Sequence, residues 1–547
     1  MDKALEMGKT SAEGSLKLFI GVAVSTVILA VGTIILGNIL TQDEYGLYQI
    51  VLIPATTIGL FRDWGVNSAI TRYVASLRTE NKDSEIRDII LAGLSFEILA
   101  GLILLLVSLL LASSIATVIL HRPESALLIS IASVSIFGGS FYNAAQSSFV
   151  GYERMGLNSF TLISQSVVKV GLGLLLVLFG YGALGAVLGF AGSSLLAGLT
   201  GVLILHSIFL RDDKKENQNK SVLSARSRHT RETLKKMLRY GVPISLSSVL
   251  PSILAQFYAF LIASYVTSNV AYSNYAVAGF FTVLLTFIST PILTVLFPVF
   301  AKLDGEKENV LARSIFASSV KYTALVLVPA TMAIMVLSKP MIATLFPGRY
   351  IDAPFFLTLS VIVNLFAVFG YFSLGGFLSG LGETRIFAML AIITTSFGVS
   401  LGIALIPMYG IPGVLIGNAI SVVPSMCFGL YWVWKHYRAK ADFKSSAKIS
   451  FAAAFAAVTT YVPLNLIHSY AWIELVTGIL MFFFVYLVAA PLTGALTQSD
   501  INVIRSMFSG LGIASTIIGV PLKVTEKAAQ IKSLRQRRVT AATDRMK

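Results

Sequence analysis

The sequence is poor in charge. Asp, Glu, Lys and Arg make up only 13% of its 547 residues, whereas a soluble chain has about a quarter of its residues charged. Hydrophobic residues make up 55%, and the mean hydropathy is +0.80. A water-exposed surface cannot be built from this composition, which excludes an ordinary soluble enzyme or binding domain.

Cysteine and histidine are also scarce. The one cysteine, Cys427, lies in an apolar run and cannot form an internal disulfide. The five histidines are scattered, and no two have the i, i+4 spacing of a helical metal site. A Walker phosphate loop is missing, so ATP hydrolysis by this chain is not expected. The sequence therefore predicts no catalytic residues, no metal site and no cofactor.

Apolar runs of about 20 residues recur along the whole chain, and each is long enough to cross the hydrocarbon of a bilayer. They do not alternate between polar and apolar residues, so they predict helices rather than barrel strands. The first run is too long for a cleaved signal and indicates a retained span. We place fourteen spans at residues 16–40, 46–70, 88–112, 125–150, 157–180, 183–209, 239–265, 273–299, 314–337, 354–379, 384–406, 411–434, 448–467 and 472–495.

The orientation follows from Lys and Arg, which accumulate in cytoplasmic segments. With the N-terminus inside, 37 of the 42 basic residues lie on the inner side, and the outer loops hold only Arg122, Lys339 and Arg349. The sequence therefore predicts a multi-pass protein of the cell membrane with both termini in the cytoplasm. The net charge of +15 reflects this bias and requires no nucleic acid.

An internal repeat relates two parts of the chain. Tyr45-Gly-Leu-Tyr48 opens the second span, and Tyr272-Ser-Asn-Tyr275 opens the eighth, 227 positions later. Six spans keep the same orientation, so the repeats are parallel and surround an axis along the membrane normal. Two further pairs of landmarks lie at offsets of 229 and 228: Val170-Gly-Leu-Gly173 with Val399-Ser-Leu-Gly402, and Tyr181-Gly-Ala-Leu-Gly185 with Tyr409-Gly-Ile-Pro-Gly413.

The predicted fold is therefore an all-α polytopic membrane protein with two six-helix lobes and two extra C-terminal helices. Two similar lobes suit alternating access, although a duplicated scaffold without transport is the alternative. The basic tail is either an amphipathic helix on the inner membrane surface or disordered. The predicted divisions are an N-lobe at 1–210, a basic cytoplasmic linker at 211–238, a C-lobe at 239–440, spans 13 and 14 at 441–495, and a cytoplasmic tail at 496–547.

Ionisable side chains inside the predicted spans are candidates for function, because they rarely face lipid. We expect Arg62 and Lys169 to line a cavity and hold an anionic group such as a phosphate. The alternative is that they form ion pairs between helices. Asp63 and Glu97 are expected to serve as counter-ions rather than to bind a coupling ion. The polar neighbours on these spans, which complete the predicted binding set, are Asn67 and Gln165.

Several stretches, taken in order, resemble one family. They are Tyr45-Gly-Leu-Tyr48, the segment from Phe61 to Tyr73, Gly151-Tyr-Glu-Arg154, Gly380-Leu-Gly-Glu-Thr-Arg385, and the Tyr-Gly turns before spans 6 and 12. The sequence resembles oligosaccharide flippases of the polysaccharide-transport type, in the multidrug/oligosaccharidyl-lipid/polysaccharide exporter superfamily. The resemblance covers residues 10 to 495, without the basic tail.

The resemblance implies a V-shaped transporter that moves a lipid-linked glycan from the inner to the outer leaflet, for cell-surface polysaccharide or glycoprotein assembly. Its partners would be membrane lipid and a glycan on a polyprenyl phosphate or pyrophosphate, with H⁺ or Na⁺ coupling left open and a monomer expected. Basic residues of the first lobe hold the head group in such proteins, and Arg62 occupies a matching position. Lys169 is added from its depth in span 5 alone.

Two other functions remain open at this point. An ion-coupled multidrug or cation antiporter of the same superfamily would use acidic residues such as Asp63 or Glu97, but the basic bias of the first lobe argues against a cationic substrate. A membrane glycan polymerase would need catalytic groups in large outer loops. The outer loops here are short, and the longest, 338–352, has no paired carboxylates.

Overall fold

The computed structural model describes residues 2–209, 222–301, 309–466, 469–508 and 525–528. These residues form helices and short connections, and none of them forms a β-strand, which confirms the predicted all-α fold. Parts of the predicted linker (211–221) and of the predicted tail (509–524 and 529–547) lie outside the described residues.

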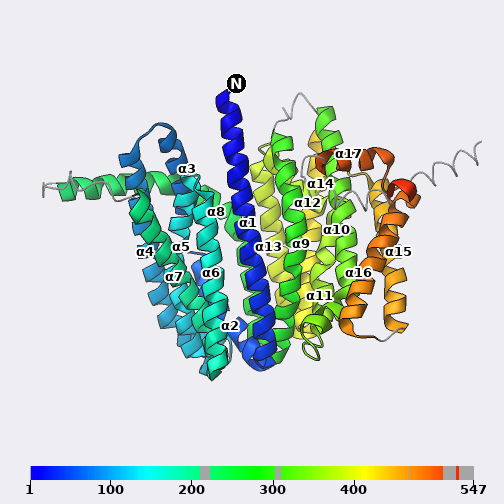
Figure 1. Cartoon of the computed structure of the whole chain (residues 1–547), viewed down its shortest axis with the longest axis horizontal. Helices are drawn as coiled ribbons and strands as arrows, with labels where there is room; N and C mark the ends of the chain where they lie inside the picture. The colour runs from blue at the N-terminus through cyan, green and yellow to red at the C-terminus, as the bar shows by residue number, and fades with distance from the viewer. Residues whose placement is uncertain (1, 210–221, 302–308, 467–468, 509–524, 529–547) are drawn as a thin grey trace, which may run out of the picture. The chain divides into compact units, whose positions relative to one another are not determined.

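The chain divides into two compact units. Unit 1 comprises Met1–Ala276 and Ile406–Gly410. Within it, α5 packs against α4 and α7, and α6 packs against α1 and α7, as nearly parallel rods (Figure 1). Its helices are α1 (Asp2–Ile39), α2 (Gln42–Gly59), α3 (Val66–Thr79), α4 (Asp83–Ser114), α5 (Ala126–Gly151), α6 (Met155–Leu176), α7 (Gly182–Phe209) and α8 (Val222–Tyr265), with the short turns η1 (Ile115–Ile119), η2 (Pro123–Ser125) and η3 (Val177–Tyr181).

Unit 2 comprises Val277–Leu405 and Ile411–Lys547. Helix α10 packs against α15 and α16, and this contact holds one of its apolar cores. The helices that lie wholly or mainly in this unit are α9 (Asn269–Ala301), α10 (Asn309–Leu345), α11 (Ala353–Val361), η4 (Ile362–Phe369), α12 (Tyr371–Gly380), α13 (Thr384–Tyr409), α14 (Ile411–Tyr437), α15 (Phe443–Leu466), α16 (Ala471–Thr493) and α17 (Gln498–Phe508).

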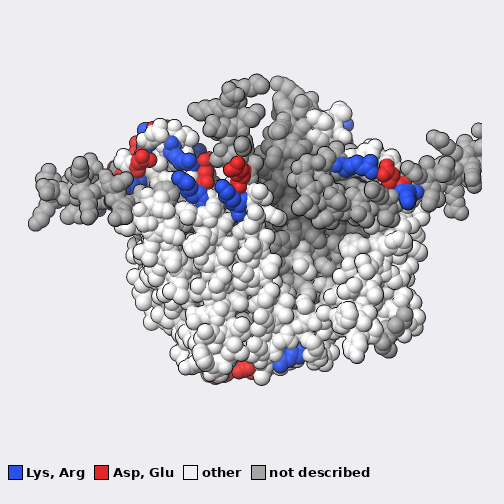
Figure 2. Space-filling model, in the orientation of Figure 1, with Lys and Arg blue, Asp and Glu red and all other residues white. Residues whose placement is uncertain are grey.

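Apolar side chains cover the lengths of the helices. Leu110, Phe179 and Phe484 are 81%, 73% and 63% exposed, and on the face in Figure 2 the charged side chains lie near helix ends with a white surface between them. Among the described residues, nine helices are long and apolar enough to cross a membrane, or ten when a pair bent by 59° counts as one span. Each of the fourteen predicted spans overlaps a helix or a broken pair of helices; the count of fourteen stays a prediction.

Helix α8 belongs to unit 1, where it packs against α2, α3 and α4. Unit 1 therefore extends to Ala276, beyond the residue 210 at which the sequence analysis ends the N-lobe. The reason is local: α8 contributes buried Met237 to the apolar core that also contains Val66 and Ile90. The six plus six plus two division stays a prediction.

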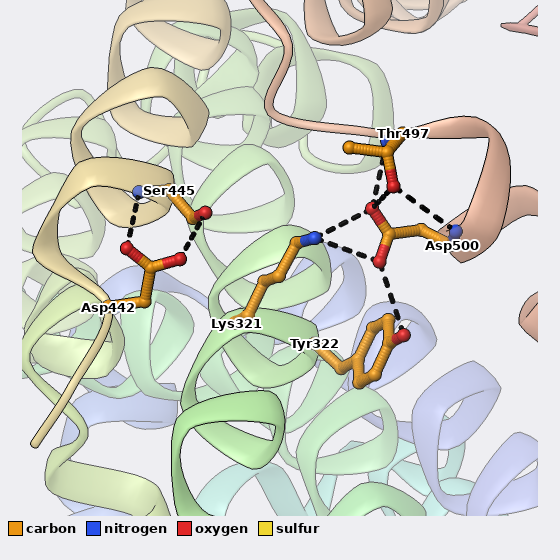
Figure 3. A network of polar contacts seen from close by, with 6 residues as sticks. All are labelled: Lys321, Tyr322, Asp442, Ser445, Thr497 and Asp500. Carbon is orange, nitrogen blue, oxygen red and sulfur yellow. Dashed lines mark hydrogen bonds and ion pairs between the residues drawn. The ribbon is translucent and has the colours of Figure 1, made fainter. Parts of the chain in front are cut away.

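A partly buried ion pair attaches α17 to α10 in unit 2 (Figure 3). The Lys321 ammonium lies 2.8 and 2.6 Å from the two carboxylate oxygens of Asp500. Tyr322 Oη donates to the same carboxylate at 3.2 Å, and the backbone N–H of Thr497 donates at 2.8 Å. Burial would raise the pKa of Asp500, but the hydrogen bonds from Lys321 and Thr497 outweigh it, so the pKa lies below its ordinary value.

We expect Asp500→Asn to lower the thermal stability of unit 2 at neutral pH, because it leaves Lys321 without its anion. The folded pKa of Asp500 is depressed, so its contribution is complete above the unfolded pKa of about 3.9 and is lost as the pH falls further. The difference in Tm between wild type and Asp500→Asn should therefore shrink below about pH 4. Asp442→Asn is the comparison variant, because the Asp442 carboxylate is exposed, hydrogen-bonds Ser445 and acts on Lys321 only through its charge, so a smaller loss is expected (Figure 3). An equal loss in both variants would contradict the assignment.

Candidate functional site

The second predicted span is broken in the middle. Helix α2 ends at Gly59 and α3 begins at Val66, whereas the sequence analysis places one continuous span at 46–70. Gly65, just before α3, has φ of +80°, a left-handed backbone that favours glycine. A Cβ atom on Gly65 would lie 2.1 Å from the backbone oxygen of Gly241 in α8. The break is thus fixed by direct backbone packing against another helix.

The Arg62 guanidinium lies at this break and contacts two other helices. Its Nε donates to Glu97 Oε2 of α4 at 2.8 Å, and its Nη1 donates to the carbonyl oxygen of Ile136 in α5 at 3.1 Å. Asn67 Nδ2 donates to the other oxygen of Glu97 at 2.7 Å. Arg62 is 7% exposed and Glu97 is 0% exposed. A Cβ atom on Gly139 would lie 2.4 Å from Arg62 Nη1, so this glycine makes room for the cation.

Two further polar groups complete the cluster. The Asp63 carboxylate accepts a hydrogen bond of 3.2 Å from the backbone N–H of Asn67 and so caps the first turn of α3. Ser245 of α8 donates to the carbonyl oxygen of Asp63 at 2.9 Å. Asn67 is 8% exposed, and its Oδ1 is buried without a hydrogen-bond partner among the described residues. The cluster therefore keeps one unused acceptor beside the Glu97 carboxylate.

Helix α8 also contacts α2 through polar groups. Thr56 and Thr57 each have a hydroxyl 3.3 Å from Gln256 Oε1. Gln256 is not in the predicted binding set, because its partners lie 199 and 200 positions earlier in the sequence. A polar side chain in an apolar run was its only sequence signal.

Lys169 and Gln165 lie one turn apart on α6, where they face α7. The Lys169 ammonium lies 5.1 Å from the centroid of the Phe190 ring, and Gln165 Nε2 is 3.5 Å from Ser194 Oγ. Within the described part of the chain, Lys169 has neither an ion pair nor a hydrogen bond. The structure thus brings Arg62 together with Asp63, Asn67 and Glu97, and it records no contact between that cluster and Lys169.

Arg122, in the loop between α4 and α5, is a buried cation, whereas the predicted topology treats it only as a charge in an outer loop. It is 4% exposed and donates to the carbonyl oxygens of Ala263, Val266 and Thr267 at 2.7 to 2.9 Å. Its Nε donates to Asn269 Oδ1 at 2.7 Å. Burial lowers the pKa of Arg122, but a guanidinium remains charged at neutral pH. It therefore caps the C-terminal end of α8 with a positive charge.

The opening motif of the second span lies at the same place. A Cβ atom on Gly46, within Tyr45-Gly-Leu-Tyr48, would lie 2.0 Å from the backbone oxygen of Asn269. Asn269 is the first residue of α9 and lies three positions before the second copy of the motif, Tyr272-Ser-Asn-Tyr275. The first motif thus packs against Asn269, the residue that Arg122 binds, and the repeat pattern does not predict this contact.

Two family models match the chain. The model of the polysaccharide biosynthesis protein family matches residues 11–304, and that of the lipid II flippase MurJ family matches residues 158–488. Each match covers more than half of the 547 residues. A sequence search of curated proteins found no match.

Solved structures of transporters share the fold. The lipid II flippase MurJ in an inward closed conformation has a TM-score of 0.65 and 16% identity, over 86% of this chain and 97% of that chain. An inward-facing multidrug resistance MATE family transporter has a TM-score of 0.59 and 16% identity, over 77% and 98%. A MOP superfamily transporter from Pyrococcus furiosus has a TM-score of 0.54 and 20% identity, over 79% and 96%.

These identities establish the fold alone, whereas the family models cover the chain by sequence. The predicted family is therefore confirmed. The chain belongs to the polysaccharide biosynthesis protein family and the lipid II flippase MurJ family, and it is a multi-pass membrane transporter and not an enzyme.

Proposed function

We propose that the protein flips a lipid-linked oligosaccharide from the inner to the outer leaflet by alternating access, with both of its termini in the cytoplasm. The observation that carries this proposal is the charge left available in the helices of unit 1. Lys169 has only an aromatic ring as partner among the described residues, whereas the Glu97 carboxylate is held by Arg62 and Asn67. Lys169 is thus a basic group without a counter-ion among the described residues, and an anionic phosphate or pyrophosphate would supply that counter-ion.

The physical requirement supports the same substrate class. A charged, hydroxyl-rich head group cannot cross hydrocarbon without polar partners, while a polyprenyl chain can remain in the lipid. Lys169 and Gln165 on α6 offer an ammonium and an amide one helical turn apart. Arg62 and Asn67 also belong to the proposed binding set. Because the Arg62 guanidinium is bound to Glu97, a phosphate would have to compete with that carboxylate for it.

Glu97 is the proposed point of proton coupling. The charged side chains that act on it are Arg62 and Asp63. Protonation of Glu97 would weaken its attraction to Arg62, and after a flip of the Asn67 amide the new O–H could donate to Asn67 Oδ1, which has no hydrogen-bond partner among the described residues. Proton uptake would thereby free the guanidinium for an anionic head group.

A cation antiporter of the same superfamily is the second candidate, because MATE transporters share the fold. Such a transporter needs an acidic group free to bind the cation. Glu97 is already paired, and Asp63 accepts the N–H of Asn67 at the start of α3. These contacts favour the anionic substrate over the cationic one.

We expect Lys169→Ala to slow flipping of a polyprenyl-pyrophosphate glycan in proteoliposomes by roughly ten- to a hundredfold, the effect of losing a charge-assisted hydrogen bond. Lys169→Arg should retain much of the rate, and Lys82→Ala, an exposed lysine paired with Glu80, should retain all of it. Uptake of a labelled organic cation is measured in the same vesicles. Unchanged flipping in Lys169→Ala, or robust cation uptake by the wild type, would overturn the proposal.

A further inference from the structure

A turn rich in basic and aromatic side chains joins α14 to α15. Four exposed cations lie on it within ten positions: Lys435, Arg438, Lys440 and Lys444. We call these four residues the basic turn. It connects two helices that are both long and apolar enough to cross a membrane, so it lies where the head groups of the surrounding lipids lie.

One tryptophan is central to the basic turn. The Arg438 guanidinium and the Lys440 ammonium lie 5.5 and 5.7 Å from the centroid of the Trp434 ring. Trp434 itself is 36% exposed, and the nearby Tyr431 and Phe443 are more than half exposed. Exposed aromatic rings at the ends of membrane helices are typical of the lipid head-group region.

The backbone supports this arrangement. Arg438 has φ of +53°, a left-handed conformation that is uncommon for a residue with a Cβ atom. The same turn is held from within unit 2, because Arg313 donates to the carbonyl oxygen of Tyr437 at 2.8 Å and Tyr437 Oη donates to Glu383 at 3.0 Å. The turn that carries the cations is therefore a fixed part of the fold.

Little negative charge accompanies these four cations in the basic turn. Asp442 lies within the turn, but its carboxylate accepts hydrogen bonds from the backbone and hydroxyl of Ser445. None of the four forms an ion pair within the described part of the chain. By contrast, Arg78 and Lys82 in unit 1 pair with Glu153 and Glu80. With four cations and the one carboxylate of Asp442, the segment 435–444 thus presents a net charge of +3 to the head-group region.

We propose that the basic turn binds the phosphate of an anionic phospholipid, with Trp434 packed at the level of the head group. The lipid supplies the negative charge that the described part of the fold does not, and juxtamembrane clusters of Lys and Arg attract anionic lipid in this way. This lipid site is separate from the proposed glycan site and does not depend on it, since every residue that forms it lies in unit 2.

The test uses Trp434 as the reporter. Trp64, Trp432 and Trp472 are replaced by phenylalanine, and the chain is reconstituted in phosphatidylcholine with brominated phosphatidylglycerol or brominated phosphatidylcholine. Bromine quenches an adjacent indole, so the two titrations give the relative affinity for the two head groups. We expect phosphatidylglycerol to be preferred roughly fivefold or more, and the combined substitution K435Q/R438Q/K440Q/K444Q to reduce the ratio to about one.

Two controls make the result decisive. The pair R78Q/K82Q removes the same kind of charge from ion-paired positions and should leave the lipid preference unchanged. Native mass spectrometry of the chain with all four tryptophans counts bound phosphatidylglycerol independently of the phenylalanine substitutions. Equal quenching by both lipids in the wild type, or a preference that survives the fourfold substitution, would overturn the proposal. So would displacement of the lipid by inorganic phosphate beyond the effect of chloride at equal ionic strength.

Discussion

Replacing Glu97 with alanine is expected to lower the free energy of unfolding by about 3–5 kcal/mol, the usual cost of removing one partner of a buried ion pair. The substitution leaves the Arg62 guanidinium, which is 7% exposed, without its counter-ion. It also leaves Asn67 Nδ2 without its acceptor. Reversible unfolding in mixed micelles, followed by circular dichroism, measures the loss.

Two companion variants separate the charge from the packing. Glu97→Gln keeps an oxygen for Arg62 or Asn67, so we expect a smaller loss than for alanine. The double variant Arg62→Leu/Glu97→Leu removes both charges and should recover most of the stability, because a buried pair replaced by apolar side chains is often neutral or stabilising. A loss below about 0.5 kcal/mol in Glu97→Ala, the range of an ordinary surface substitution, would show that the pair is not a structural unit.

Arg122→Ala is expected to lower the free energy of unfolding by roughly 3–5 kcal/mol. Hydrogen bonds to a charged group contribute about 1.5–3 kcal/mol each, and the contributions of several such bonds do not simply add. Its five donors are bound to the oxygens of Leu120, Ala263, Val266, Thr267 and Asn269. The loss of stability should also include local opening of the backbone around the bound carbonyl groups. Hydrogen exchange of the α8–α9 connection, residues 263–269, should therefore increase in the variant.

Arg122→Lys and Lys339→Ala are the controls for this prediction. An ammonium has three donors without the planar fork of a guanidinium, so Arg122→Lys should recover less than half of the loss. Lys339 is an exposed cation, and its removal should change stability by no more than about 0.5 kcal/mol. The capping role of Arg122 is refuted if exchange at 263–269 is as slow in Arg122→Ala as in the wild type.

The sequence alone determined the features that depend on local composition. Hydropathy averaged over about 20 residues locates a membrane helix, and each predicted span overlaps a helix or a broken pair. The family followed from short motifs in order along the chain, and the family models confirm it. The sequence also shows directly which ionisable residues lie inside apolar runs, among them Arg62, Glu97 and Lys169.

Only the tertiary structure decided what those side chains contact. Arg62 hydrogen-bonds Glu97, which is 35 positions away in the sequence, and Arg122 hydrogen-bonds Asn269, which is 147 positions away. The residues next to them in the sequence do not predict either pairing. The break at Gly65 depends on the backbone of Gly241 in another helix. Whether a segment enters the membrane depends on the composition of that one helix, whereas whether a charged side chain is paired depends on which helices pack together. The sequence therefore predicts the same role for Arg62 and Lys169, but in the structure Arg62 pairs with Glu97, and Lys169 has no ion pair among the described residues.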